Sequence, residues 1–325
     1  MSIYSKKFIC IEEDFPAKKW LDFYNGVSSG YHKWYFQEGN IQKPSLDECR
    51  TALEQYMPKF VSLWEHLRNL TSAEDEMARM LSLYCPTPYK RGCTQAAWTR
   101  YSPVLVRNYD YSPSLFEGRI LKSKWFDTNV IATTDCLWGA LDGINEHGLC
   151  ISLAYGGSDI IGKGFGITLV VRYILEFCKS SAEAIELLKK IPINMAYNIT
   201  VMDKYYHVST IELSPFDEPK VTACPFAVNQ QGGFDLNNYS IFSNSSDRKQ
   251  SISELLFDPL VSIESFIAAF GYAPLYSTDY ENSFGTLYTA IYNPFLRASE
   301  YRWPGDVRLY QSFEHFIEQE VNIVY

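Results

Sequence analysis

Hydrophobic residues in the first part of the chain recur at helical spacing. Ser45 and Glu48 have the spacing of a capping box, and apolar side chains follow on one predicted helix face at Leu46, Cys49, Leu53, Tyr56, Met57, Phe60, Trp64 and Leu67. Pro58 lies within this run and should kink or split the helix, because proline cannot donate the helical hydrogen bond. We therefore expect a short extended start followed by helices up to residue 92.

A second helix is predicted before the pattern changes. Thr71 or Ser72 is its expected N-cap. Pro86 and Pro88 should end it, since the residue before a proline avoids helical backbone angles. The segment Pro86–Gly92 is then an extended linker.

From Cys93 onward the pattern is mostly that of strands. Two alternating runs, 94–99 and 104–109, flank a turn signal at 101–103 and predict a β-hairpin that begins at Cys93. Further strands are predicted at 129–134, 149–154, 196–202, 207–213, 221–228 and 286–292. Helices are predicted at 168–177, 181–191, 247–257 and 261–270, the second opened by a capping box of Ser180 and Glu183. Strand runs grouped around paired helices favour an α+β fold in which helices cover the sheet faces.

The composition is that of a globular, mildly acidic protein. Of 325 residues, 46% are hydrophobic, and 29 basic against 38 acidic side chains leave a net charge of -9. Without a basic run, nucleic acid and anionic membrane surfaces are not expected as partners. The sequence shows neither a membrane span nor the core of a signal peptide, so we expect a cytoplasmic protein. The eight cysteines lack a Cys-x-x-Cys pair and the five histidines lack ligand spacing, so we expect reduced thiols, no metal and no cofactor.

Candidate chemistry centres on Cys93, which follows Gly92 and precedes Arg107-Asn-Tyr-Asp110 at hairpin distance. The thiolate form of cysteine is a nucleophile. Cleavage of the Gly92–Cys93 bond would place a new α-amine on the same residue, and its ordinary pKa of about 7.7 to 8.0 suits proton transfer near neutrality. Before cleavage, the same thiol could attack the Gly92 carbonyl, which has no Cβ beside it. These residues therefore favour a nucleophile that needs no histidine base.

Three further segments complete a set of motifs: Asp142-Gly-Ile-Asn-Glu-His-Gly-Leu149, Val228-Asn-Gln230 and Ser246-Asp-Arg248. Together with Gly92-Cys-Thr94 and the Arg107 segment, this set resembles the N-terminal-nucleophile (Ntn) amidohydrolases. It resembles in particular the acyl-coenzyme A:6-aminopenicillanic acid acyltransferases, which are related to choloylglycine hydrolase and penicillin V acylase. The resemblance implies a four-layer αββα fold and a precursor, or zymogen, that cleaves itself before the cysteine. It further implies a helical pro-segment of residues 1–92, retained as a small subunit, and a catalytic domain of residues 93–325.

The resemblance also implies roles for the hairpin residues. Cys93 would be the nucleophile and, through its freed amine, the base. Asp110 would hold the amine, and Arg107 would lie beside the thiolate and lower the pKa of the thiol. An ideal strand sends Arg107 and Asp110 to opposite faces, so a bulge or strand end near Asn108 is expected to intervene.

The oxyanion site is implied with one position left open. Asn229 would donate its side-chain amide to the oxyanion, and Arg248 would brace the site. The second contributor aligns with either Ala154 or Tyr155, and Tyr155 could donate through its side chain or its backbone. Gln230 and Gln231 stand where many acyltransferase relatives have His-Phe, which puts the substrate pocket of those relatives in doubt.

The predicted reaction is hydrolysis of a linear amide, or acyl transfer, through an S-acyl intermediate on Cys93. The partner is then a small N-acyl amide or acyl thioester, and formation of a homo-oligomer is left open. A different interpretation is an unprocessed, catalytically silent protein that binds small acyl compounds or protein partners. A less favoured one is a papain-like triad of Cys93, His207 and Asn229, although papain-like cysteines open helices and Cys93 opens a predicted strand.

Overall fold

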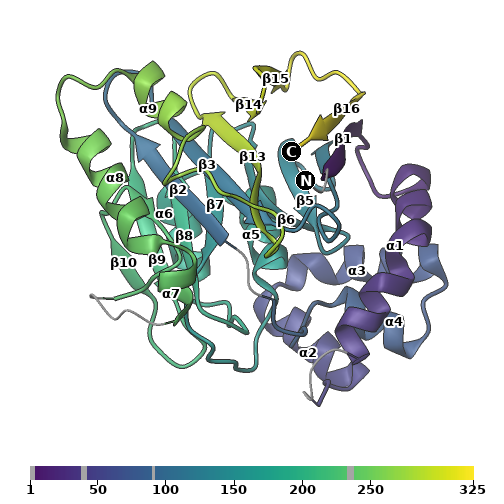
Figure 1. The fold of residues 1–325 in the computed structure, drawn as a ribbon. Helices are drawn as coiled ribbons and strands as arrows, with labels where there is room; N and C mark the ends of the chain where they lie inside the picture. Colours follow the sequence, from purple (N-terminus) through teal and green to yellow (C-terminus); the bar gives the residue numbers. More distant parts are fainter. Residues whose placement is uncertain (1–3, 38–41, 90–91, 233–237) are drawn as a thin grey trace.

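Two β-sheets stack face to face at the centre of the molecule, and helices cover their outer faces (Figure 1). The computed structural model describes residues 4–37, 42–89, 92–232 and 238–325. The predicted α+β class with an αββα arrangement of layers is confirmed.

The larger sheet contains, within the described residues, nine strands in the order β10-β9-β8-β7-β6-β5-β4-β1-β16. Their bounds are β1 Ser5–Glu12, β4 Arg119–Ser123, β5 Val130–Asp135, β6 Gly139–Asn145, β7 Cys150–Tyr155, β8 Tyr197–Met202, β9 Val208–Leu213, β10 Lys220–Thr222 and β16 Gln319–Val324. The smaller sheet follows the order β11-β2-β3-β13-β14-β15, and β12 pairs with β13. Its bounds are β2 Gly92–Trp98, β3 Val104–Tyr111, β11 Phe226–Ala227, β12 Thr278–Asp279, β13 Phe284–Asn293, β14 Ala298–Trp303 and β15 Val307–Ser312.

Helices pack on the outer face of each sheet. On the larger sheet α5 (Ile167–Phe177) contacts β6 and β7, with α6 (Ser181–Leu188) beside it. Nearly every side chain of α5 is buried, and its two charged residues, Arg172 and Glu176, pair with each other at 2.6 Å. On the smaller sheet, α8 (Ser245–Phe257) and α9 (Ile263–Ala269) cover an apolar cluster formed with β2, β3 and β13. The short helix α7 (Asn238–Phe242) precedes α8.

The N-terminal segment contributes a strand to the larger sheet as well as helices. β1 lies between β4, with which it is parallel, and β16, with which it is antiparallel. The helices α1 (Lys18–Gln37), α2 (Leu46–Tyr56), α3 (Val61–Thr71) and α4 (Asp75–Leu81) follow and lie together on one side of the molecule (Figure 1). Residues 5–12 are thus held by strand pairing on both edges.

Most of the predicted local signals in this segment are confirmed. Ser45 and Glu48 form the reciprocal capping box. Pro58 does split the predicted helix, because α2 ends at Tyr56 and a turn of 3₁₀ helix over Pro58–Phe60 precedes α3. The predicted cap at Thr71 or Ser72 is wrong: Ser72 has left-handed backbone angles and ends α3, and Glu74 precedes α4. Of the predicted linker 86–92, residues 90 and 91 lie outside the described part of the chain.

In the second part the hairpin and the predicted helices are confirmed, with two local corrections. The predicted strand 221–228 is interrupted and forms two short strands in different sheets, β10 and β11. Ser180 caps α6 by accepting from the Glu183 backbone, but the Glu183 carboxylate accepts from Lys179 instead of Ser180, so the box is not reciprocal. Strands β4, β6, β12, β14, β15 and β16 were not predicted.

Candidate active site

The β2–β3 hairpin places Cys93 and Arg107 on the face that is turned toward the other sheet. Cys93 lies opposite Tyr109, and Gln95 lies opposite Arg107. Arg107 Nη2 donates to Cys93 Sγ at 3.0 Å, while Nη1 pairs with Asp142 of β6. Burial opposes the charge of Arg107, but the charges of Cys93, Tyr288 and Asp142 raise its pKa well above the usual value. The sequence-predicted arginine therefore stands beside the thiol as a buried cation.

The alternate residues of β3 face the helices on the other side. Asn108 donates to the carbonyl oxygens of Phe270 (2.7 Å) and Leu275 (2.9 Å), which fixes the segment after α9. Asp110 accepts from Thr286 at 2.6 Å and pairs with Arg248. The four motif residues from 107 to 110 thus divide evenly between the two faces.

The bulge expected near Asn108 is absent from β3, so that prediction is wrong. β3 pairs with β2 without interruption from Val104 to Asp110. The register shift lies in the neighbouring strand β13, between Thr286 and Tyr288. The thiol of Cys93 points to the inner face, where Arg107 lies, and the backbone nitrogen of Cys93 lies near the end of the strand. Arg107 and Asp110 therefore do not have to share a face, and no bulge is required.

Asn229 meets the backbone of Cys93. Its Oδ1 accepts from the Cys93 N–H at 3.0 Å, and its Nδ2 donates to the carbonyl oxygen of Tyr155 at 3.1 Å. The hydroxyl of Tyr155 is used elsewhere, since it donates to Ser158 O (2.7 Å) and to Asp159 Oδ1 (3.0 Å). Tyr155 therefore holds Asn229 through its backbone, while its hydroxyl is bonded to Ser158 and Asp159.

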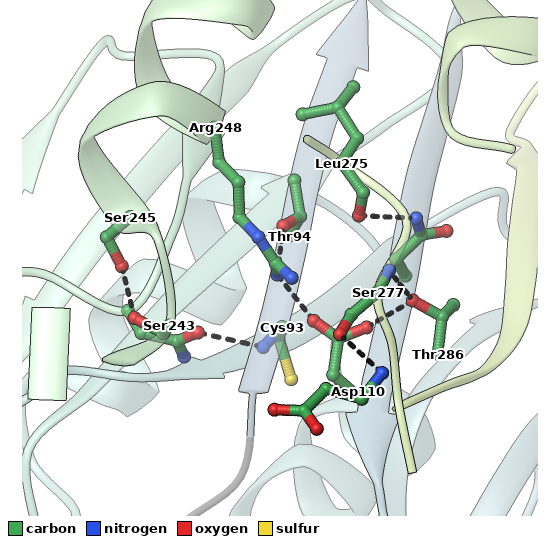
Figure 2. A network of polar contacts seen from close by, with 12 residues as sticks. Cys93, Thr94, Asp110, Ser243, Ser245, Arg248, Leu275, Ser277 and Thr286 are labelled. Carbon is green, nitrogen blue, oxygen red and sulfur yellow. Dashed lines mark hydrogen bonds and ion pairs between the residues drawn. The ribbon is translucent and has the colours of Figure 1, made fainter. Parts of the chain in front are cut away.

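Arg248 extends from α8 to the outer side of the hairpin. Its Nη1 donates to Thr94 Oγ1 at 3.0 Å and pairs with Asp110 Oδ2. Figure 2 shows Arg248 reaching from its helix to Asp110 beside Thr94, with Thr286 on the other side of the carboxylate. Both members of this ion pair are buried. The arginine thus fixes Asp110 at the position opposite Gly92 in the hairpin register.

Sequence reasoning missed the residues that cover the bond between Gly92 and Cys93. Phe284 lies against Gly92, because a Cβ added at Gly92 would come within 2.5 Å of the ring. Phe242 of α7 contacts Phe284 with ring centroids 4.8 Å apart. Tyr239, also of α7, packs perpendicular to Tyr155, and its pKa is raised by burial and then by the charges at Cys93 and Asp110. Such a role cannot be recognised from the sequence, since most aromatic side chains belong to the hydrophobic core.

The role of Asp142 was also missed, although its motif was noted. Asp142 accepts from Tyr288 at 2.6 Å and from Tyr292, both on β13. These phenols lie in the other sheet, so the network joins the two layers beneath the thiol. Nothing local to Asp142 in the sequence indicates these partners.

The papain-like alternative is wrong. The side chain of His207 is 74% exposed and lies 3.4 Å from Asp203, whereas Cys93 is fully buried in β2. Cys93 does not open a helix, and His207 is not among the contacts of the thiol described above. Within the described residues no group of three or more His, Cys, Asp or Glu is placed to hold a metal ion.

A cavity of about 610 Å³ lies one layer of rings away from Cys93. Tyr109 separates the two: its ring contacts the guanidinium of Arg107 at 4.9 Å and the rings of Tyr111 (5.9 Å) and Phe116 (5.3 Å), which line the cavity. The opposite wall comes from α1, including Phe23, Val27, Tyr31 and Trp34. The cavity is therefore shared by the N-terminal segment and the segment that follows β3.

Comparison with protein families gives a match over residues 98–307, well over half of the chain, to the model described as acyl-coenzyme A:6-aminopenicillanic acid acyl-transferase. The chain belongs to this family. The matched range contains Arg107, Asp110, Asn229 and Arg248, and Cys93 lies just before it. The resemblance of the sequence motifs to the acyl-coenzyme A:6-aminopenicillanic acid acyltransferases is thereby confirmed.

Solved structures with a similar fold include three enzymes of low sequence identity. Penicillin V acylase from Agrobacterium tumefaciens is 14% identical, with a TM-score of 0.48, over 68% of this chain and 86% of that one. An N-acylethanolamine-hydrolyzing acid amidase ortholog from Caenorhabditis elegans is 15% identical, with a TM-score of 0.45, over 66% and 94%. A mutant of conjugated bile acid hydrolase from Clostridium perfringens is 12% identical, with a TM-score of 0.45, over 72% and 96%. Comparison with curated protein sequences gives no match.

None of these likenesses is close enough to transfer a residue role or a substrate to this member of the acyltransferase family.

The described helices include none that is long and apolar enough to cross a membrane.

Proposed function

We propose that this protein hydrolyses linear amides or transfers their acyl group, with Cys93 as the nucleophile, after cleavage of the bond between Gly92 and Cys93. One observation carries the proposal. The two functional atoms of Cys93 meet separate partners, since Sγ accepts from Arg107 at 3.0 Å and the backbone N–H donates to Asn229 at 3.0 Å. Arg107 thus contacts the thiol, and Asn229 contacts the nitrogen that would become the α-amine.

Maturation would begin with attack of Cys93 Sγ on the carbonyl carbon of Gly92. A C–S bond forms, the C–N bond breaks, and the nitrogen of Cys93 takes the proton lost by the thiol. Water then hydrolyses the thioester, leaving a carboxylate on Gly92 and both a thiol and an α-amine on Cys93. Asp110, which lies opposite Gly92 and pairs with Arg248, would accept from the new ammonium group.

Turnover would repeat the same bond changes on a substrate. The thiolate attacks the amide carbonyl, Asn229 donates to the oxyanion, and the α-ammonium gives its proton to the leaving amine. Water or an acceptor amine then takes the acyl group from sulfur and restores the thiol. Residues 1–92 and 93–325 would be the two products of maturation.

We further propose that the N-terminal product stays bound after cleavage. β1 pairs with β4 on one edge and with β16 on the other, so its release would remove a strand from within the sheet. Such a loss would break two ladders of backbone hydrogen bonds, with β4 and with β16. A cytoplasmic location and a homo-oligomeric state stay predictions.

The cavity next to Tyr109 is our candidate for the acyl group of the substrate. Its walls carry aromatic and aliphatic side chains from α1 and from Tyr111 to Phe116. A volume of about 610 Å³ falls in the range of sites that enclose small organic ligands. The pro-segment would then help to select the substrate.

The test is to trap the acyl group on the protein. Purified protein is incubated with a panel of N-acyl amines and acyl thioesters, and peptide mass spectrometry locates any adduct. An adduct on Cys93 is expected, with none in Cys93→Ala and an unchanged yield in Cys224→Ala, which removes a partly exposed cysteine. Absence of an adduct across the panel would contradict the proposal and favour a silent, ligand-binding protein.

A further inference from the structure

Asp142 lies on the far side of Arg107 from the nucleophile. One nitrogen of the guanidinium donates to Cys93 Sγ at 3.0 Å, and another pairs with Asp142 Oδ2. All three side chains have an exposed fraction of 0%. A single buried cation is therefore shared between a carboxylate and a thiol.

Phenol hydroxyls on β13 donate to Asp142. Tyr288 donates to one carboxylate oxygen at 2.6 Å, and Tyr292 donates to the other. The hydroxyl of Tyr292 lies 3.3 Å from the hydroxyl of Tyr301, and Thr133 Oγ1 donates to the Tyr301 hydroxyl at 3.4 Å. This network fixes the carboxylate of Asp142 beside Arg107.

The charges around Cys93 form two balanced pairs. Arg107 pairs with Asp142 on the inner face, and Arg248 pairs with Asp110 on the outer face. Among the described residues, phenols also face these pairs, at Tyr109, Tyr239, Tyr276, Tyr280, Tyr288, Tyr292 and Tyr301. Phenols are neutral at ordinary pH, so they leave the charges of the two ion pairs unchanged.

We propose that Asp142 is a positioning residue which, by balancing Arg107, sets the pH at which Cys93 ionises. The inference rests on the proposed function in taking Cys93 as the nucleophile. Asp142 keeps the guanidinium oriented between its own carboxylate and the sulfur, and it prevents Arg107 and Cys93 from forming a permanent ion pair.

The test is a pH titration of the thiolate in Asp142→Asn and in the wild type. The ultraviolet absorbance of the thiolate is read as the difference between each protein and its Cys93→Ser counterpart, and intact mass ensures that forms in the same state of cleavage are compared. The ionisation midpoint is expected to fall by about one to two pH units in Asp142→Asn, because the charge of Arg107 then acts on the sulfur alone. Tyr301→Phe, which alters a hydroxyl one contact further out, should leave the midpoint unchanged. A folded Asp142→Asn protein with the wild-type midpoint would overturn the inference.

A second pair of variants covers the case in which Asp142→Asn does not fold. Arg107→Gln leaves the carboxylate unpaired but still bonded to Tyr288 and Tyr292, whereas Arg107→Gln/Asp142→Asn removes both charges. The double variant is expected to ionise about one pH unit lower than Arg107→Gln, and equal midpoints would count against the proposal. The titration needs neither substrate nor cleavage. An inactive protein that shows the shift would contradict the proposed function alone, and an active protein without it would contradict this inference alone.

Discussion

Replacement of Gly92 by alanine tests whether the Gly92–Cys93 bond is packed as tightly as the structure indicates. A Cβ at this position would lie 2.5 Å from Cζ of Phe284, closer still to Cε2, and 2.8 Å from Cβ of Asp110. Carbon atoms normally approach to about 3.5–4.0 Å, so the ring would have to move by about 1 Å. Phe284 is 5% exposed and is flanked by Phe242 (4.8 Å) and Arg248 (5.2 Å), which leave it little room.

The expected cost of Gly92→Ala is therefore about 1–3 kcal/mol in the free energy of unfolding, as for other overpacked cores. The measurement is urea denaturation in a Cys93→Ala background, where the chain stays whole. Phe284→Leu removes both clashing ring atoms, so most of the cost should disappear when the two substitutions are combined. The contact with Asp110 remains, and recovery should be incomplete.

The double-mutant cycle decides the matter. A coupling of at least about 1 kcal/mol between Gly92→Ala and Phe284→Leu is predicted. If Gly92→Ala is as stable as its parent, or if it loses the same free energy with and without Phe284, the account of this contact is refuted.

Three further predictions concern charge and catalysis. Asp110→Asn should lower the free energy of unfolding by about 3–5 kcal/mol in urea, because it leaves Arg248 buried without its counterion, and Asp110→Asn/Arg248→Met should lose less. Burial lowers the pKa of Lys43 from 10.5 to about 8, so the unfolded chain binds the extra proton between these values and stability rises with pH there. Lys43→Met should lack this rise, which amounts to about 1 kcal/mol after solvent screening. The free energies of unfolding of the wild type and the variant are measured in urea at pH 7 and at pH 10. If the difference between the two proteins is the same at both pH values, the prediction is contradicted. Asn229→Ala should reduce kcat by about 10²–10³-fold with a small change in KM, and an unchanged kcat would exclude Asn229 from the oxyanion site.

Local signals in the sequence predicted the elements that form locally. The capping box at Ser45, the break at Pro58 and the hairpin from Cys93 depend on a few adjacent residues, and the structure has all three. Ser72 was misassigned because serine suits a helix start, while the backbone there takes the left-handed angles of a helix end.

Features that depend on distant pairing could not be predicted. β1 reads as a short extended start, and its place between β4 and β16 follows from residues more than a hundred positions away. The contacts of Asp142 with Tyr288 and Tyr292 cross from one sheet to the other, so no periodic pattern in the sequence indicates them. The bulge was predicted on the assumption that Arg107 and Asp110 act on one face. In the structure Arg107 contacts the thiol of Cys93 on the inner face, and Asp110 lies on the outer face.

The central claim is that Cys93 becomes the first residue of an enzyme. Its most direct test is the intact mass of freshly purified wild-type protein beside Cys93→Ala. The account predicts two fragments in the wild type, divided between Gly92 and Cys93, and a single full-length chain in the variant. A wild-type protein that stays whole and still turns over amides would contradict it, because the base would then not be the freed α-amine.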